Sequence, residues 1–164
     1  MTSPDGPYFE DFEPGQVLVP APITIGPEEA EVYGTICPDP LRVSGSAELA
    51  RQVTGIDGPI ANPTLVLQMA IGQSTIATRH VVANLFYRGV RIRKQLRLGA
   101  TVSTSVRILG MSEATRRPDR PPRGKVLLGV TTTDETGDVI IDFERCALIP
   151  FRDDDDPATD SETR

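Results

Sequence analysis

The chain has 164 residues, 38% of them hydrophobic, and a formal net charge of −6. This length suits one domain that buries its own core. No apolar run approaches the ~20 residues of a membrane span, and the acidic, polar start MTSPDGPYFEDF is unlike a signal peptide. With only two thiols, Cys37 and Cys146, we expect a cytoplasmic protein without a disulfide framework.

The negative charge is concentrated at the end of the chain. Residues 152–164 carry two basic and six acidic residues, so they contribute −4 and leave −2 for the rest. We expect this segment to be a disordered acidic tail and residues 1–7 to be a flexible leader. One domain is predicted over residues 8–151. Its nearly neutral charge argues against nucleic acid as a partner.

The first half of the domain reads as one strand followed by three helices. Residues 16–25 are predicted to form a strand, and 26–36 a helix that begins at a proline. Residues 44–55 form a second short helix, with serines to cap its start and glycine to end it. The most apolar segment, 62–79, is predicted to contain a helix over about 64–79. Its first two turns have almost no polar face, so other structure must surround it.

After residue 80 the hydrophobic period changes to two, which indicates strands. The expected strands cover residues 82–92, 101–109, 125–133 and 138–150. In the second of these, one face is predicted to carry Val102, Thr104, Val106 and Ile108. A central helix followed by antiparallel strands is an α+β arrangement, one sheet curled around one helix. This is the description of the hotdog fold.

Four stretches resemble a known family: YFEDFEPGQ (8–16), GPIANPTLVLQMA (58–70), VANLFYRGVRI (82–92) and RRPDRPPRGKV (116–126). In order and spacing they are similar to the MaoC-like dehydratases. This hotdog family includes (R)-specific enoyl-CoA hydratases and mesaconyl-CoA-type hydratases. The resemblance implies a hotdog fold, an acyl-CoA or acyl-carrier-protein thioester as the substrate, and pairing with a second hotdog subunit.

The family motif Asp-x-Asn-Pro-x-His falls on residues 37–42, but its catalytic pair is replaced. Cys37 stands at the aspartate position, Asp39 at the asparagine position and Arg42 at the histidine position, while the proline is kept. The family's usual histidine before the central helix is Asn62. The resemblance therefore places the active site here and predicts a degenerate version of it.

In the family, aspartate and histidine activate a water molecule, while backbone N–H groups at the start of the central helix polarise the thioester carbonyl. Here Thr64 and Leu65 would have to donate, since a proline at position 63 has no N–H. Arg42 stays charged in a protein and cannot act as a base. A site rebuilt from Asp39 and Cys37 is one hypothesis, because a nearby cation lowers a thiol pKa. An Asp39–Arg42 ion pair in a turn and a pocket that only binds are the alternatives.

Two basic groups remain. One lies on and after the strand at 82–92 and includes Arg91 and Arg93, and the other lies in the proline-rich loop within 116–125. They indicate either solvated surfaces or capture of the phosphates of coenzyme A or pantetheine. His80, the only histidine, follows the central helix and is expected to cap it or lie on the surface. We expect no metal and no cofactor beyond coenzyme A or pantetheine as part of the substrate.

Three functions follow for such a chain. The favoured one is a subunit of an acyl-thioester hydratase or dehydratase that lacks its own dyad and supports a competent partner, as a heterodimer or a homodimer. A self-sufficient hydratase using Asp39 and Cys37 is the second, and a non-catalytic thioester-binding or scaffolding protein is the third. A thioesterase that uses Asp39 is a remoter option.

Overall fold

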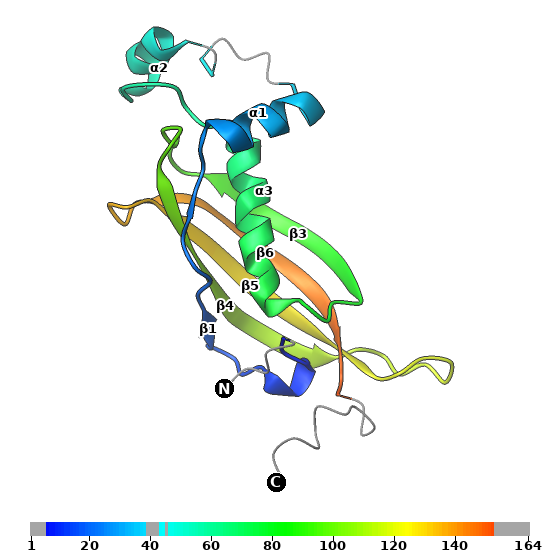
Figure 1. The fold of residues 1–164 in the computed structure, drawn as a ribbon. Helices are drawn as coiled ribbons and strands as arrows, with labels where there is room; N and C mark the ends of the chain where they lie inside the picture. The colour runs from blue at the N-terminus through cyan, green and yellow to red at the C-terminus, as the bar shows by residue number, and fades with distance from the viewer. Residues whose placement is uncertain (1–5, 39–42, 45, 153–164) are drawn as a thin grey trace, which may run out of the picture.

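The computed structural model describes residues 6–38, 43–44 and 46–152. The acidic tail predicted from residue 152 onward therefore lies almost entirely outside the described residues. In chain order two short strands come first, then three α-helices and then four long strands, and Figure 1 shows one helix lying across a curled sheet. The sheet has six strands, whose bounds are β1 Val17–Leu18, β2 Ile23–Thr24, β3 Ala83–Ile92, β4 Thr101–Glu113, β5 Arg123–Thr133 and β6 Val139–Pro150.

All the strand pairs are antiparallel. The order across the sheet is β1-β4-β5-β6-β3, and β2 also pairs with β4. Consecutive strands β4, β5 and β6 lie side by side, whereas β3 comes before them in sequence and pairs with the far side of β6. The α+β fold class with an antiparallel sheet around a central helix is confirmed.

The predicted strand at 16–25 is interrupted. It forms two strands of two residues each, β1 and β2, with Pro20 and Pro22 between them. Proline has no backbone N–H to donate to a neighbouring strand, so a continuous ladder is lost at this point. Each short piece still pairs with β4, at Val17–Arg107 and at Ile23–Val102.

The three predicted helices are present with shifted ends. They are α1 Pro27–Ile36, α2 Ala47–Thr54 and α3 Pro63–Gln73, and a one-turn helix η1 Phe9–Asp11 precedes them. α3 is shorter than the predicted 64–79, because a 3₁₀ turn, η2 Ser74–Ala77, replaces its last part. There the hydroxyls of Ser74 and Thr75 donate to backbone carbonyls three residues earlier, at 2.7 and 2.6 Å. Such side-chain bonds compete with regular helix geometry.

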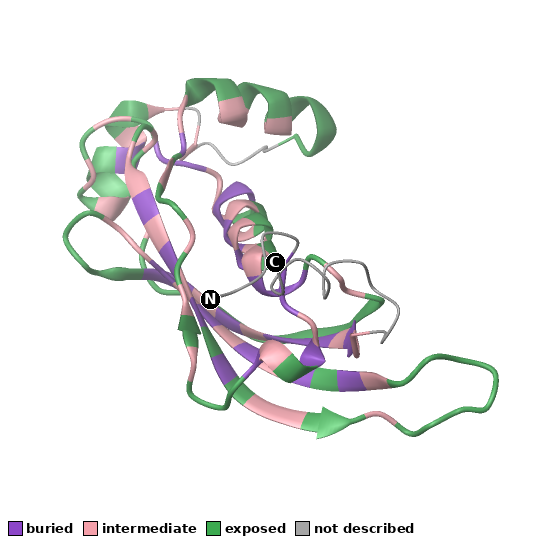
Figure 2. Cartoon of the chain, turned by 60° about the horizontal axis from the view of Figure 1, so that its bottom comes forward, coloured by how far each residue is buried: buried purple, intermediate pink, exposed green. Residues whose placement is uncertain are grey.

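The core lies between α3 and the inner face of the sheet. The predicted face of β4 is buried, and Figure 2 shows the resulting bands of buried residues along the strands. On β5 the alternate residues Val126, Leu128 and Val130 are buried with it. Thr104 lies within this core because its hydroxyl bonds both Thr132, at 2.8 Å, and the side chain of Gln73 on α3.

Strand β3 differs from the other long strands because all ten of its residues are exposed. It pairs with β6 on one side, and no other described strand pairs with its second edge. Five large apolar side chains are exposed along it, namely Leu85, Phe86, Tyr87, Val90 and Ile92. No helix in the described part of the chain is long and apolar enough to span a membrane.

Candidate functional site

The motif region at 37–42 is only partly described. Cys37 is the residue that ends α1: its N–H donates to the Tyr33 carbonyl at 2.8 Å, and its side chain is exposed. Asp39 and Arg42 lie outside the described residues, and so does the alternative in which they form an ion pair. The assignment of catalytic roles to these three residues stays a prediction.

The start of α3 is closed by a chain of hydrogen bonds. Asn62 caps the helix, and its side-chain oxygen accepts from the Thr64 N–H at 2.8 Å and from the Thr64 hydroxyl at 2.6 Å. The Tyr33 hydroxyl on α1 donates to the Thr64 hydroxyl at 3.0 Å. One of the two predicted carbonyl-polarising donors is thus already used by the cap. Leu65, the other, has a buried side chain, and its N–H lies in the first helical turn, where N–H groups lack intrahelical partners.

Tyr33 was missed by sequence analysis. It lies one turn before Cys37, half-buried, and packs against the core from α1. Its bond to Thr64 joins residues that are 31 apart in the sequence. An aromatic residue in the helix before the motif was the available signal, but the contact itself depends on how α1 crosses the start of α3. Figure 1 shows α1 passing close to that end of α3.

The two arginines predicted to bind substrate anions share one carboxylate. This carboxylate belongs to Asp142 on the neighbouring strand β6. Arg91 contacts it at 3.0 Å and Arg93 contacts it at 2.5 Å. The hydrogen bond from Arg93 is the main cause that holds the pKa of Asp142 below its usual range. Arg88 is likewise paired with Glu144, at 2.6 Å. These cations are offset by carboxylates across the strand pair.

A second ion-pair group lies at the turn between β5 and β6. The Lys94 ammonium contacts Asp134 at 2.9 Å and Asp138 at 2.8 Å. Burial acts to raise the pKa of Asp134, but hydrogen bonds from Thr136, Lys94 and two backbone N–H groups outweigh it and lower the pKa to about 2. This group ties the chain after β3 to the turn at the end of the sheet.

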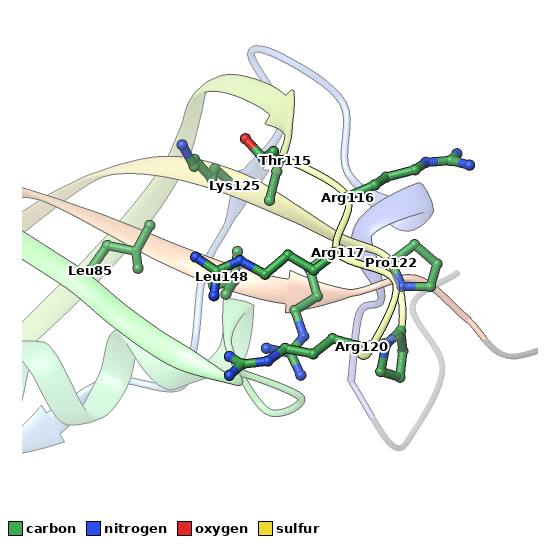
Figure 3. Close-up of a pocket in the computed structure, with 11 residues that line it drawn as sticks. Leu85, Thr115, Arg116, Arg117, Arg120, Pro122, Lys125 and Leu148 are labelled. Atoms are coloured by element: carbon green, nitrogen blue, oxygen red, sulfur yellow. The ribbon is translucent and has the colours of Figure 1, made fainter.

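The proline-rich loop between β4 and β5 borders a half-open hollow of about 300 Å³, drawn in Figure 3. Its basic lining residues are Arg116, Arg117, Arg120, Arg123 and Lys125. Arg120 contacts Asp119 at 3.5 Å, and both side chains are largely exposed. This basic group is therefore gathered around a hollow, in contrast to the paired arginines of β3.

Arg145 on β6 is a buried cation that sequence analysis did not identify. It is 1% exposed, and its guanidinium donates to Ser74 at 2.6 Å, to Thr78 at 3.3 Å and to the side-chain oxygen of Asn84. It also lies over the Tyr87 ring, 5.3 Å from the centroid. Burial lowers its pKa. Since its partners are neutral and lie at the C-terminal end of α3 and on β3, its role is to fasten that end of the helix to the sheet.

The other two residues singled out in the sequence are His80 and Cys146. His80 is half-buried, and its ring stacks on Tyr8 with centroids 4.2 Å apart. Cys146 is buried in the last strand, as expected, and burial raises the pKa of its thiol. Within the described residues no group of three or more histidine, cysteine, aspartate or glutamate side chains could hold a metal ion.

The chain is similar to known proteins over nearly its whole length. It is 40% identical to RV0216 of Mycobacterium tuberculosis, a conserved hypothetical protein with a double hotdog fold, at a TM-score of 0.87 over 93% of this chain and 47% of that one. A solved MaoC domain protein dehydratase from Chloroflexus aurantiacus J-10-fl matches at 25% identity and a TM-score of 0.79, over 93% of this chain and 42% of that one.

Among curated proteins, β-methylmalyl-CoA dehydratase of the same Chloroflexus aurantiacus strain is 25% identical over 158 residues, which are 95% of this chain and 44% of that protein. The chain thus spans a little under half the length of each of these three proteins. No protein-family model matches it. With one central helix against an antiparallel sheet, and with these structural neighbours, the chain has the hotdog fold, and its resemblance to the MaoC-like dehydratases is confirmed.

Proposed function

We propose that the chain is a hotdog subunit of the acyl-thioester dehydratase and hydratase type that takes its proton-transfer residues from a partner hotdog unit. The observation that carries this proposal is the combination of a hotdog fold over 93% of the chain with Cys37 and Arg42 at the motif positions for aspartate and histidine. The fold is kept while the residues that move protons are replaced.

The chemistry explains why the replacement matters. Hydration of a 2-enoyl thioester needs a base that takes a proton from water while the oxygen bonds to the β-carbon, and an acid that protonates the α-carbon. An arginine at position 42 cannot take a proton near neutral pH, because its guanidinium remains charged. Cys37 is exposed at the C-terminal end of α1.

Strand β3 supports the partner half of the proposal. Its free edge and its row of exposed apolar side chains form the kind of surface that another strand or subunit covers. The relative with 40% identity has a double hotdog fold, of which this chain spans 47%. A second hotdog unit, on a separate subunit or on a further domain, would extend the sheet along β3.

The acyl group would lie beside the start of α3. Ala61, Val66, Ile92 and Leu96 line a crevice there that has no room for a water molecule in this structure, so an acyl chain would have to open it. Pro63, the first residue of α3, also lines the crevice, and the Leu65 N–H in the same helical turn would be the donor to the thioester carbonyl. The subunit would hold the acyl chain, and the partner would supply the base.

Hydration of crotonyl-CoA and of a longer enoyl-CoA tests this proposal. The purified chain is expected to give no turnover alone and clear turnover when mixed with the MaoC-like protein that co-purifies from its source cells. Turnover by the chain alone that is lost in Asp39→Asn would contradict the supporting role and favour a rebuilt site. Silence in both assays, with the thioester still bound, would contradict the enzymatic proposal and favour a binding protein.

A further inference from the structure

The described chain leaves the sheet directly beside the basic hollow. Pro150, the last residue of β6, pairs with Arg123, which lines the hollow. The next residue, Phe151, donates its N–H to the carbonyl of Pro122 in the proline-rich loop, at 3.4 Å. Figure 1 shows the end of β6 running past the base of this loop. The residues that follow position 152 in the sequence therefore start next to the hollow.

This exit point is held on its other side by the acidic start of the domain. The Arg152 N–H donates to the Glu10 carboxylate at 3.1 Å, and the Arg152 guanidinium contacts Asp11 at 2.9 Å. The ring of Phe151 packs on Phe9, with centroids 4.8 Å apart. Arg152 is thus already paired, and two carboxylates outnumber it, so further negative charge is repelled from this side of the exit point.

The loop carries cations that the described carboxylates do not balance. Residues 116–125 contain five basic residues and one acidic residue, so their net charge is +4. Arg120 contacts Asp119 at 3.5 Å, with both side chains largely exposed, and the other four cations form no ion pair within the described part of the chain. The arginines of β3, by contrast, each contact a carboxylate of β6. Gathered cations of this kind repel one another and favour an anion with several charged oxygens.

The sequence supplies such an anion directly after the exit point. Residues 153–156 are four consecutive aspartates, and this acidic run has a charge of −4 against the +4 of the loop. The run lies outside the described residues, but its length sets its reach. An extended chain advances about 3.5 Å per residue, so four residues span about 14 Å. That reach is sufficient for the run to meet a hollow of about 300 Å³ whose border begins at the loop that Phe151 contacts.

We propose that the basic hollow under the β4–β5 loop is the docking site of the acidic run at 153–156 of the same chain. This inference is independent of the proposed function, because it uses neither the motif at 37–42 nor the free edge of β3. The run has an advantage over a separate acidic partner, since a short connection holds it at an effective concentration of about 1 mM.

Docking of the run would make it a built-in competitor for other anions. Each exposed carboxylate–guanidinium pair is weak alone, so the contact depends on several pairs forming together and weakens as salt is added. While the run is docked, another anion reaches the loop cations only by displacing it. The segment then limits which anions the hollow accepts, without any change in the fold.

Titration calorimetry of the full chain with inorganic pyrophosphate tests this competition. Changing all four aspartates at 153–156 to asparagine is expected to tighten pyrophosphate binding about tenfold, because the competitor loses its charge. The gain should shrink as sodium chloride rises from about 0.05 M to about 0.3 M. A matched variant removes four exposed carboxylates from α1, from the segment after α2 and from the β5–β6 turn, and should change the affinity by less than about twofold. Its substitutions are Glu28→Gln, Glu31→Gln, Asp57→Asn and Glu135→Gln.

Amide NMR spectra locate the contact. Between the unaltered chain and the asparagine variant, signals of residues 115–125 are expected to shift, while those of α1 and α2 stay in place. In a chain that already carries Arg117→Gln and Arg120→Gln, the same change at 153–156 should shift these signals by less than half as much. Arg51→Gln is the control for the loop, because Arg51 lies on α2 and pairs with Glu48.

Three results would overturn the docking. The first is equal pyrophosphate affinity in the asparagine variant and the unaltered chain, or an equal gain in the matched variant. The second is a set of amide shifts outside residues 115–125, which would assign the run to another surface. The third is a shift that grows with protein concentration, which would place the run on a second copy of the chain.

Discussion

Strands β5 and β3 flank the same strand, β6, yet they have opposite environments. β5 pairs on both sides and buries every second residue, whereas β3 pairs on one side and exposes all ten residues. Both contain long apolar side chains, so composition does not explain the difference. Both hydrogen-bonding edges of β5 are therefore paired within this chain, whereas one edge of β3 is left for another strand. The core holds the chain together, and the β3 edge is where a partner is expected.

The largest effect is expected inside β5. Leu128 is completely buried, so Leu128→Ala should lower the free energy of unfolding by about 3 kcal/mol through lost burial and an unfilled cavity. Val90→Ala on β3 is the control, and it should change stability by less than about 0.5 kcal/mol. Urea unfolding of both variants measures this difference. Equal losses would mean that β3 is as deeply packed as β5.

A smaller loss is expected where β5 meets the start of the chain. A Cβ atom at Gly124 would lie 2.1 Å from the Phe9 ring, so Gly124→Ala should force that ring to move and cost about 2 kcal/mol. Gly72→Ala on α3 is the matched control, because nothing lies within 4 Å and alanine favours helix. Thermal unfolding compares the two. An unchanged midpoint for Gly124→Ala would show that Phe9 is not held against β5.

At β3 the expected effect is on association and not on folding. Val90→Lys places a charge on the exposed strand, which should weaken pairing with a hotdog partner by tenfold or more while leaving the unfolding midpoint nearly unchanged. Val53→Lys makes the same change on the exposed face of α2. Sedimentation of the mixed proteins measures association. Equal weakening by both variants would place the partner elsewhere.

The smallest effect concerns the ion pairs that fasten the end of β3 to the β5–β6 turn. Because the pKa of Asp134 is lowered to about 2 in the folded chain, its stabilising contribution is complete above the usual carboxyl pKa near 4 and is lost as pH falls toward 2. We expect Asp134→Asn to flatten the loss of stability over this range, by less than about 1 kcal/mol because Lys94 is partly exposed. Denaturant titrations between pH 2 and 5 measure the free energy of unfolding of both proteins. If the ion pair contributes nothing, that free energy will change with pH equally in Asp134→Asn and in the unaltered chain.

The alternation of Val102, Thr104, Val106 and Ile108 was enough to predict the buried face of β4, because a strand with one buried face shows a period of two. Pro20 and Pro22 could have predicted the break between β1 and β2. The apolar residues around them favoured a single strand instead. The pairing of Arg91 and Arg93 with Asp142 depends on the register of β3 against β6, which no local pattern reveals.

The burial of Arg145 is the feature that the sequence was least able to predict. An arginine next to Glu144 in an alternating strand reads as a surface residue, yet it is buried because Ser74, Thr78 and Asn84 supply neutral oxygens from distant parts of the chain. The candidate site was predicted from the motif frame at 37–42 and from Asn62, and it stays a prediction because Asp39 and Arg42 lie outside the described residues. The Tyr33–Thr64 bond was not found, since it exists only once α1 crosses α3.

The most direct test of the central claim is the hydration rate of the mixed complex when this chain carries Cys37→Ser, Asp39→Asn and Arg42→Gln together. If the partner supplies the proton-transfer groups, the complex should still form and hydrate enoyl-CoA at a rate within about threefold of that of the unaltered pair, since positioning residues alone are changed. A loss of a hundredfold or more in kcat, with the complex intact by sedimentation, would contradict the account and make these three residues the active site.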